Sequence, residues 1–380
     1  MTEWKTYRLG DIAKFQTGKL NSNAAVENGK YPFFTCSPNT LAIDNYAFDK
    51  EAILLAGNNA EGNFSIKYYK GKFNAYQRTY IIETYNDICD IKFLFYALKL
   101  CLQQFKLMSQ GTSTKFLTAV ILNNFEISLP SLEEQRRIAG ILGAIDDKIE
   151  CNRRINANLE LQAQALFDNL MSNSNLEYKL IADINHIIET GRRPKGGVAN
   201  ITRGVPSIGA ENIKGLGKYD YSKTKYITAE FAETLKKGII KGYELLIYKD
   251  GGKPGYFIPN FSIFGEGFPY DNMTLNEHVF LLDFGNKGYN FFAYFYMQTE
   301  EVMKYLNAQG SKAAIPGINR NDVESIFIPT IDNKEVKEFC DIVEPIITAI
   351  LVNSKESSRL ASLRDTLLPK LMNGEIKVDE

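Results

Sequence analysis

The longest regular pattern of apolar positions in the chain runs from Ser131 to Met171. Apolar side chains recur there at spacings that alternate between four and three residues, at Ile138, Leu142, Ile145, Ile149, Leu159, Ala163, Leu166 and Leu170. This spacing places them in one stripe along a single helix. Ser131 followed by Glu134 fits a capping box at the helix start. Such a helix would be about 60 Å long, so its narrow apolar stripe requires a partner helix.

A second stretch, from Asp332 to Met372, repeats the first with a constant offset of 201, so that Asp332 takes the place of Ser131. The sequence therefore predicts that the two helices pair through their stripes. The predicted interface consists of Ile138, Leu142, Ile145, Ile149, Leu159 and Leu166 in the first helix and Phe339, Val343, Ile346, Ile350, Leu360 and Leu367 in the second.

Both stripes also contain polar or irregular positions. Asn152 and Asn156 interrupt the first stripe where Asn353 and Ser357 interrupt the second, and polar residues at such positions typically fix the register of paired helices. In the second copy, Arg364 takes the place of Ala163, so we expect the neighbouring Leu363 to supply the packing. Pro345 and Pro369 should bend or break the second helix, because proline removes a backbone donor.

The repeat extends beyond the helices. Each half opens with a segment that ends in a Thr–Gly turn, Thr17–Gly18 or Thr190–Gly191, and the segments 110–130 and 309–329 also correspond. The matched ends bracket dissimilar middles, 19–109 and 192–308. This arrangement favours one scaffold that presents two different recognition surfaces, although unconstrained drift would leave the same divergence. The predicted domains are 1–130, 131–172, 173–331 and 332–380.

The middles contain short strand patterns. Apolar runs at 52–56, 79–83, 244–248 and 279–283 predict strands, whereas 91–111 has a helical pattern. The segment between the first two runs is rich in turn-forming residues and amides. The chain is therefore predicted to have α+β architecture, with two globular α/β domains joined by two long helices.

Composition bounds the class of protein. The 380 residues are 44% hydrophobic and 23% charged, which is typical of a globular protein. We expect a cytoplasmic location and no membrane partner, because neither a secretory signal nor a membrane span is apparent. The five cysteines are scattered, which argues against a disulfide framework or a zinc site.

The formal net charge of −1 argues against a nucleic-acid binder, but its distribution is uneven. Lys and Arg outnumber Asp and Glu by 14 to 11 in residues 1–130 and by 18 to 17 in 173–331. The acids prevail in the two helical regions, by 7 to 5 in 131–172 and by 10 to 7 in 332–380. An anionic ligand would therefore meet the globular parts.

The first middle segment combines cations, amides and aromatic residues without an acid between Gly62 and Ile82. Cations suit phosphate contacts, whereas Asn and Gln can read adenine and Arg can read guanine. The alternative is an exposed hairpin whose aromatic side chains pack inward. The candidate DNA-binding residues, including a polar loop after the predicted helix, are Asn58, Asn59, Lys67, Lys70, Lys72, Asn74, Tyr76, Gln77, Arg78, Gln110, Thr112, Ser113 and Lys115.

The second middle segment carries different side chains at comparable places. Residues 276–278 precede a predicted strand as residues 76–78 do in the first half, and different side chains there would read a different DNA sequence. The candidates in this half are Arg192, Arg193, Lys195, Lys249, Lys253, Asn272, Asn276, His278, Gln309, Ser311 and Lys312.

No segment has the pattern of an active site. The phosphate-binding pattern GxxxxGK[ST] does not occur in the sequence. The two histidines, His186 and His278, lie in different halves without a third evident ligand, so we expect no metal site. The sequence therefore predicts neither a catalytic residue nor a cofactor in this chain.

The duplicated plan resembles the specificity subunit of type I restriction–modification systems. The resemblance rests on LEEQRRI at the start of the first long helix, LRDTLLPKLMNGEI at the end of the second, the paired Thr–Gly turns, the QGT and QGS loops, and the LP and IP endings before each helix. It covers the whole chain.

This resemblance implies two target-recognition domains held a fixed distance apart by antiparallel spacer helices with pseudo-twofold symmetry. Each domain would read half of a bipartite, asymmetric target in double-stranded DNA. Two modification subunits would bring S-adenosylmethionine and adenine methylation, and restriction subunits, if present, would bring ATP and Mg. The alternatives are a duplicated protein-interaction scaffold or inhibitor without sequence-specific DNA binding, and a cryptic enzyme.

Overall fold

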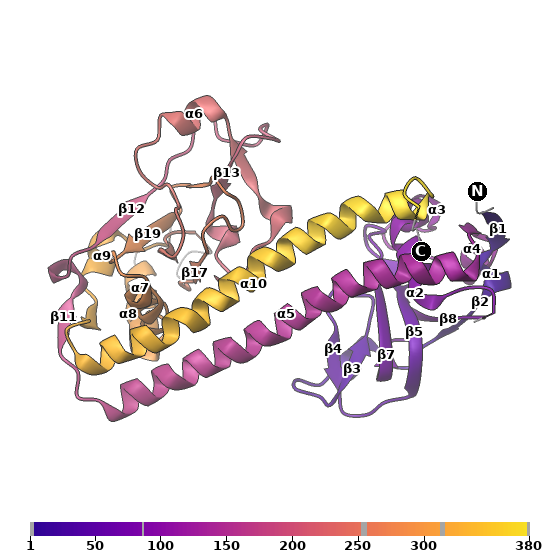
Figure 1. Ribbon diagram of the computed structural model, residues 1–380, viewed down its shortest axis with the longest axis horizontal. Helices are drawn as coiled ribbons and strands as arrows, with labels where there is room; N and C mark the ends of the chain where they lie inside the picture. The colour runs from indigo at the N-terminus through magenta and orange to yellow at the C-terminus, as the bar shows by residue number, and fades with distance from the viewer. Residues whose placement is uncertain (1–3, 86, 252–256, 312–315, 378–380) are drawn as a thin grey trace. The chain divides into compact units, whose positions relative to one another are not determined.

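The computed structural model describes residues 4–85, 87–251, 257–311 and 316–377 (Figure 1). Contacts divide the chain into two compact units. The first unit contains residues 1–147 together with 361–380, and the second contains residues 148–360. Each of the two long helices contributes one end to the first unit and the remainder to the second. The predicted α+β class is confirmed, because each unit combines sheets with helices.

The first unit is built on a six-stranded sheet. Its neighbouring strands are antiparallel except for one parallel pair, β3 with β7. The strand order is β2 (Ala13–Thr17), β8 (Thr79–Thr84), β5 (Phe48–Ala56), β7 (Ile66–Ala75), β3 (Tyr31–Phe34) and β4 (Leu41–Ile43).

Both faces of this sheet are apolar at its centre, because side chains of a strand alternate between faces. Ile53 and Ile82 share a core with Phe93 of α2 (Ile91–Leu100), the helix beside the sheet in Figure 1. On the opposite face, Leu54 packs in a separate cluster with Phe73. The predicted strands at 52–56 and 79–83 are confirmed, and they read as continuous apolar runs because both faces are covered.

A strand lies between the runs 52–56 and 79–83, where the residue types predict turns. Ile66–Ala75 forms the ten-residue strand β7, which pairs with both β5 and β3. Its Gly71 and alternating lysines hide the apolar pattern, since only Phe73, Asn74 and Ala75 are buried. Register with β5 therefore decides its conformation more than its own composition does.

The second unit contains two smaller sheets. One has the order β12 (Ile187–Thr190), β19 (Val279–Asp283), β16 (Leu245–Tyr248), β17 (Phe261–Ile263) and β14 (Gly215–Leu216). The other has the order β15 (Lys225–Ile227), β13 (Val205–Ile208) and β18 (Thr274–Leu275). The parallel pair β13–β18 and the antiparallel pair β16–β19 correspond to β3–β7 and β5–β8 of the first unit. The predicted strands at 244–248 and 279–283 are thus confirmed.

The same two-stranded ribbon closes each globular part. In the first unit β1 (Lys5–Arg8) pairs with β10 (Glu126–Leu129), and in the second β11 (Tyr178–Leu180) pairs with β20 (Phe327–Pro329). The shorter helices that complete the units are α1 (Leu9–Ile12), α3 (Leu102–Met108), α4 (Ala119–Asn124), α6 (Ala229–Glu233), α7 (Lys287–Tyr296), α8 (Glu300–Gly310) and α9 (Arg320–Glu324).

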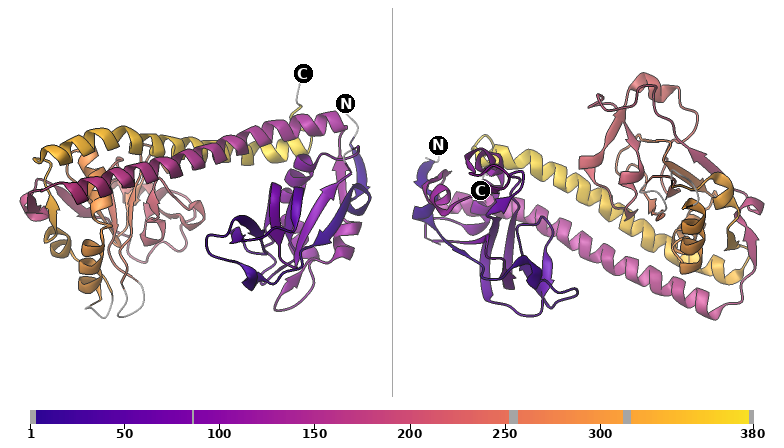
Figure 2. Two further views of the ribbon diagram at one scale, coloured as in Figure 1. Left: turned by 90° about the horizontal axis from the view of Figure 1, so that it is seen from below. Right: turned by 180° about the vertical axis from the view of Figure 1, so that it is seen from behind.

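The two predicted long helices are present. They are α5 (Leu132–Asn173) and α10 (Lys334–Met372), which run side by side in Figure 2. The amide of Glu134 donates to the Ser131 hydroxyl at 3.3 Å, so Ser131 caps α5 as predicted. The helices are antiparallel, since Asn152 contacts Glu356 whereas Asn156, one turn later, contacts Ile350.

The predicted polar interruptions meet each other in the second unit. Asn152 donates to the Ser357 hydroxyl at 3.2 Å, and Asn353 donates to the Asn156 amide oxygen at 2.9 Å. These two contacts are equivalent under the offset of 201, which exchanges Asn152 with Asn353 and Asn156 with Ser357. The repeat therefore makes a self-complementary polar layer that fixes the register of the helices.

The stripe residues pack against the globular cores as well as along the helices. Ile138 and Leu142 are buried and Leu367 is partly buried in the core of the first unit. In the second unit, Phe339, Val343 and Ile350 are buried in the core, against which Leu159, Leu166 and Ile346 pack. Ile145, Ile149 and Leu360 are half-buried.

The expected packing by Leu363 is wrong, and the prolines of α10 do not break the helix. Leu363 is 48% exposed and does not supply the packing. Arg364 fills the position itself, because its guanidinium lies 2.6 Å from Asp146, which also accepts from the Tyr96 hydroxyl at 2.6 Å. The helix continues through Pro345 and Pro369, both of which are exposed. On a solvent-facing side, water can satisfy the carbonyl that each proline leaves unpaired.

Candidate nucleic-acid interface

Three segments that are distant in sequence meet at one corner of the first unit. The amide of Gly57 donates to the carbonyl of Arg78 at 2.8 Å, and the amide of Leu117 donates to the carbonyl of Gly57 at 2.9 Å. Strand β6 (Asn58–Asn59) pairs with β9 (Lys115–Phe116). We call residues 57–59, 76–78 and 110–117 the first corner. It brings together the predicted Asn58, Asn59, Arg78 and Lys115.

Side-chain contacts give the first corner a surface of hydrogen-bond donors. The Arg78 guanidinium is exposed and lies 5.2 Å from the centre of the Phe116 ring, and a guanidinium can only donate. The Cys36 thiol donates to the Asn58 amide oxygen at 3.0 Å. This contact holds the side chain of Asn58, whose amide NH2 group can donate to an external ligand.

The predicted polar loop closes the same corner. Backbone bonds of 2.7 and 3.0 Å between Gln110 and Phe116 hold its ends together. Gly111 has φ +106°, and a Cβ there would lie 2.1 Å from the Thr114 carbonyl oxygen, so the turn requires glycine. Gln110, Thr112 and Ser113 are exposed, as contact with a large ligand requires.

The lysines of β7 do not form one basic strip with this corner. Lys67 lies on the opposite face of the strand from Lys70 and Lys72, because strand side chains alternate. Lys67 donates to the Ser37 carbonyl at 2.8 Å, and half-burial lowers the pKa of this lysine. Lys70 lies 3.4 Å from Glu51, and Lys72 lies 4.7 Å from the centre of the Tyr46 ring.

The prediction of base reading by Asn74 is wrong. Its side chain is 4% exposed, donates to the Asn45 amide oxygen at 2.9 Å and accepts from the Ala75 amide at 3.0 Å. It therefore stabilises the end of β7 from inside. Gln77 is exposed, with its amide 2.8 Å from the Asn21 oxygen, and Tyr76 is half-buried beside it.

The second unit contains a corner with the same backbone frame. The amide of Lys249 donates to the carbonyl of His278 at 2.9 Å, the amide of Ile318 donates to the carbonyl of Lys249 at 2.8 Å, and Asp250 bridges to Gly317. We call residues 249–251, 276–278, 310–311 and 316–318, together with Arg193, whose guanidinium contacts His278, the second corner. The predicted equivalence of residues 276–278 with 76–78 is confirmed by this pattern.

The Thr–Gly turns support the same correspondence. A Cβ on Gly18 would lie 1.9 Å from the Ala75 carbonyl oxygen, and a Cβ on Gly191 would lie 1.6 Å from that of Leu275. Only glycine allows this approach of two backbones. The turn motif shared by the two halves thus places the end of β2 or β12 directly against the segment that leads to Arg78 or His278.

The second corner holds a network of charged side chains. His278 Nδ1 donates to Asp250, and Arg193 lies 3.2 Å from His278 Nε2 while pairing with Glu277. His278 Nε2 also lies 3.3 Å from the Glu277 carboxylate, so the imidazole is surrounded by Asp250 on one side and the Arg193–Glu277 ion pair on the other. Lys249 lies 3.5 Å from Asp250.

Other candidates in the second unit lie outside this network. Asn276 is 3% exposed and accepts from the His278 amide at 2.8 Å, so the prediction that it reads bases is wrong. Arg192 lies 5.7 Å from the centre of the Phe231 ring. Lys195 and Asn272 are exposed, Gln309 is half-buried, and the Ser311 hydroxyl oxygen is buried. Lys253 and Lys312 lie outside the described residues.

Cys36, Asp250 and Glu277 are not among the predicted DNA-binding residues. Cys36, Asp250 and Glu277 hold the predicted Asn58, His278 and Arg193 in place. Residue type alone favours cations and amides as DNA contacts and gives no reason to choose an acid or a thiol. Asp250 follows a predicted strand, as Asn58 does, and this shared position could have identified Asp250 as a candidate.

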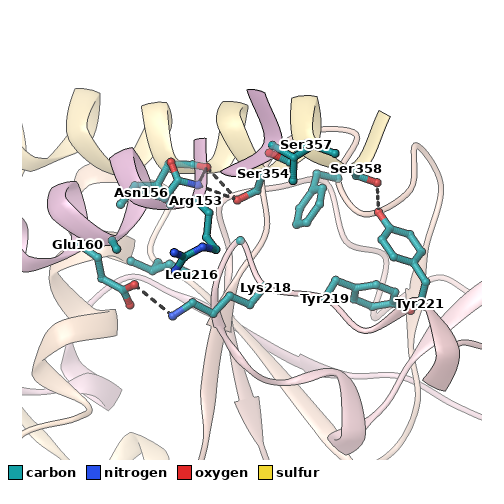
Figure 3. Close-up of a pocket in the computed structure, with 15 residues that line it drawn as sticks. Arg153, Asn156, Glu160, Leu216, Lys218, Tyr219, Tyr221, Ser354, Ser357 and Ser358 are labelled. Atoms are coloured by element: carbon teal, nitrogen blue, oxygen red, sulfur yellow. Dashed lines mark hydrogen bonds and ion pairs between the residues drawn. The ribbon is translucent and has the colours of Figure 1, made fainter. Parts of the chain in front are cut away.

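A cavity of about 540 Å³ lies between α5, α10 and the loop after β14 in the second unit (Figure 3). Its cations already have acidic partners: Arg153 pairs with Glu150 at 2.6 Å, and Lys218 pairs with Glu160 at 3.1 Å. The Tyr221 hydroxyl contacts Ser358 across it. Since these charges balance, the cavity does not suit phosphate binding, and its contacts tie the loop to both helices.

Within the described ranges, no cluster of three or more potential metal ligands occurs. No helix in the same part of the chain is both long and apolar enough to cross a membrane.

Comparisons with known proteins find similar chains of almost the same length. Residues 1–161 match the family model described as type I restriction modification DNA specificity domain. The chain is 28% identical to the EcoDI specificity subunit of Escherichia coli, with 98% of this chain and 89% of that protein covered. It is 24% identical to the MjaIX specificity subunit of Methanocaldococcus jannaschii, with 100% and 94% covered.

A solved structure shares the fold. The crystal structure of a type I restriction–modification S subunit from M. genitalium aligns with a TM-score of 0.65 at 16% identity. The alignment covers 100% of this chain and 97% of that one. At this identity, the match concerns the arrangement of the chain and leaves the choice of target open.

Proposed function

Since residues 1–161 match the type I DNA specificity domain and specificity subunits align with nearly the whole chain, we propose that the chain is such a subunit and selects the DNA target of a type I restriction–modification complex. Each unit reads one half of a bipartite, asymmetric target in double-stranded DNA. The observation that carries this proposal is the pair of corners, in which one backbone frame presents different side chains. A frame shared by two readers allows two different half-targets to be read in the same way.

The corners provide the two kinds of group that sequence recognition needs. Exposed Gln110, Thr112 and Ser113 suit contacts with the DNA backbone, which position a protein without reading sequence. Arg78 in the first corner and Arg193 in the second are exposed donors that suit the major-groove edge of guanine. Because the net charge is −1, phosphate attraction is local to such loops and weak overall.

We further propose that the chain docks two modification subunits, which supply S-adenosylmethionine and adenine methylation. Restriction subunits, where present, supply ATP-driven steps with Mg. The long helices expose apolar side chains that a partner could cover: Ile155 and Leu161 on α5 are 42% and 70% exposed, and Ile342 and Val352 on α10 are 52% and 58% exposed. The chain itself then acts by positioning its partners on the target.

Gel retardation tests the proposal. The chain co-expressed with its modification subunits is mixed with genomic DNA fragments at low salt, and retained fragments are sequenced. We expect enrichment of one bipartite motif, with affinity that falls as salt rises. Equal retention of all sequences would leave phosphate contact alone. The absence of retention, with the assembled complex verified, would favour the protein-interaction scaffold.

A further inference from the structure

The two corners present opposite hydrogen-bonding polarity at equivalent positions. Asn58 and Asp250 are equivalent because each follows the residue whose amide donates to the carbonyl of Arg78 or His278. Both also pair with the closing loop, opposite Phe116 and Gly317 respectively. An amide therefore stands in the first corner where a carboxylate stands in the second.

In the first corner the charged side chains, Arg78 and Lys115, are hydrogen-bond donors. The Asn58 oxygen accepts from the Cys36 thiol, its NH2 group can donate, and the exposed Arg78 can only donate. The Phe116 ring supports the guanidinium from one side, at 5.2 Å. Such a surface suits a base edge made of acceptors, which in the major groove is guanine, with O6 and N7.

In the second corner a carboxylate is held in a fixed position. The Asp250 side chain is 24% exposed, its Oδ1 accepts from His278 Nδ1, and its Oδ2 lies 3.5 Å from the Lys249 ammonium. That second contact is longer than a strong charged hydrogen bond, so Oδ2 retains acceptor capacity. The Arg193 side chain, 39% exposed, lies on the other side of the imidazole.

A carboxylate near DNA is repelled by the phosphates, so its presence at a reading position needs a compensating contact. Cytosine provides one, because its N4 amino group donates in the major groove, where Asp and Glu accept from it. The guanine of the same base pair offers O6 and N7 to a guanidinium. The imidazole of His278 contacts both Asp250 and Arg193, so it holds an acceptor, the Asp250 carboxylate, beside a donor, the Arg193 guanidinium.

Resting on the proposed function, we infer that Asp250 accepts a hydrogen bond from cytosine N4 in the half-target of the second unit, while Arg193 donates to the paired guanine. His278 is a positioning residue that holds both side chains. The first corner instead reads a guanine through Arg78. One shared frame thus reads a guanine on one strand in the first half and a cytosine–guanine pair across both strands in the second.

Base-substituted duplexes test this inference. The target motif is first identified with the unaltered complex, and dissociation constants are then measured for duplexes that carry each base pair at every position of the second half. For Asp250→Asn we expect discrimination at one C·G position to fall about tenfold or more, with the first half unchanged. Glu233→Gln, which removes an exposed acid of the same unit, should leave every preference intact.

His278→Gln separates positioning from folding. It should relax the same base pair less than Asp250→Asn does, and thermal melting of both variants reports whether the unit is folded. The inference is overturned if the second half contains no C·G requirement, or if folded Asp250→Asn complex discriminates as the unaltered complex does. Failure of the unaltered complex to bind any motif would instead overturn the proposed function.

Discussion

The first and second corners share a backbone and differ in chemistry. In both, a strand end donates to the carbonyl of residue 78 or 278 and accepts from a closing loop. The first corner then displays Arg78 and Asn58, whereas the second displays Asp250 and Arg193 joined through His278. Backbone hydrogen bonds therefore maintain each corner, and the side chains that the corner carries can change without loss of the fold.

The helix pair shows the same principle. Asp146 and Arg364 form an ion pair in the first unit, while the positions related to them by the offset of 201, Ile347 and Ala163, are fully buried apolar residues in the second. One polar and one apolar solution therefore occupy equivalent sites. The polar layer of Asn152, Asn156, Asn353 and Ser357 is kept in both copies.

Replacement of the whole segment 19–109 should have a larger effect than any single substitution in the two corners. Exchange of residues 19–109 for the corresponding segment of another specificity subunit should change the first half of the target completely and leave the second half intact. The methylated motif of a host that expresses the hybrid with its modification subunits provides the readout. A change in both halves would contradict the independence of the two corners.

The ion pair between the helices should matter for stability. Arg364→Ala leaves Asp146 half-buried with only the Tyr96 hydroxyl of its two described partners. We expect the free energy of unfolding of the first unit to fall by about 1.5–3 kcal/mol, as for hydrogen bonds to charged groups. Denaturant unfolding measures this change. Arg359→Ala, at an exposed position of the same helix, should change stability by less than about 0.5 kcal/mol.

Removal of the exposed guanidinium tests the first corner. Arg78→Ala should relax one base preference in the first half by about 1–3 kcal/mol, the contribution of a bidentate contact to guanine. Competition binding with single-base variants measures it. Lys70 lies on β7 and pairs with Glu51 of β5. Lys70→Ala removes this cation and should reduce affinity slightly for all DNA sequences. An equal effect of both variants would show that Arg78 contacts phosphate.

The buried side chain of Asn74 in β7 should contribute to the stability of the first unit and not to base recognition. Asn74→Ala removes a donor to Asn45 and an acceptor for the Ala75 amide, so we expect the first unit to lose about 1–3 kcal/mol. Base preferences at every position should remain. A specific shift in one base preference, with stability unchanged, would return Asn74 to the reading surface.

Much of the fold could be predicted from the sequence because it depends on repeated local patterns. The long helices follow from the spacing of residues such as Ile138 and Leu142, and the duplicated Thr–Gly turns reflect contacts that only glycine allows. Strand β7 was not predicted, because its conformation depends on pairing with β5 and β3. The sequence suggests Leu363 as a substitute for Arg364 in the apolar stripe, because the partner of Arg364, Asp146, lies more than 200 positions away.

The candidate site was predicted less completely. Residue type indicated Arg78 and His278, but Asn74 and Asn276 have the same side chain as Asn58 and are buried. Burial depends on strand register, which residue type does not reveal. Asp250 and Cys36 act through contacts with segments that are distant in sequence. The sequence therefore identified the kind of chemistry, and the three-dimensional structure identified which side chains can perform it.

Methylation-aware sequencing can show whether the two units each read one half of a DNA target. A host genome is sequenced while it carries this chain and its modification subunits, and again with the chain deleted. We predict methylated adenines within one bipartite motif, two short unlike halves separated by unspecified bases, that disappears on deletion. An uninterrupted motif, or a motif that persists without the chain, would contradict the account that two units each read half of the target.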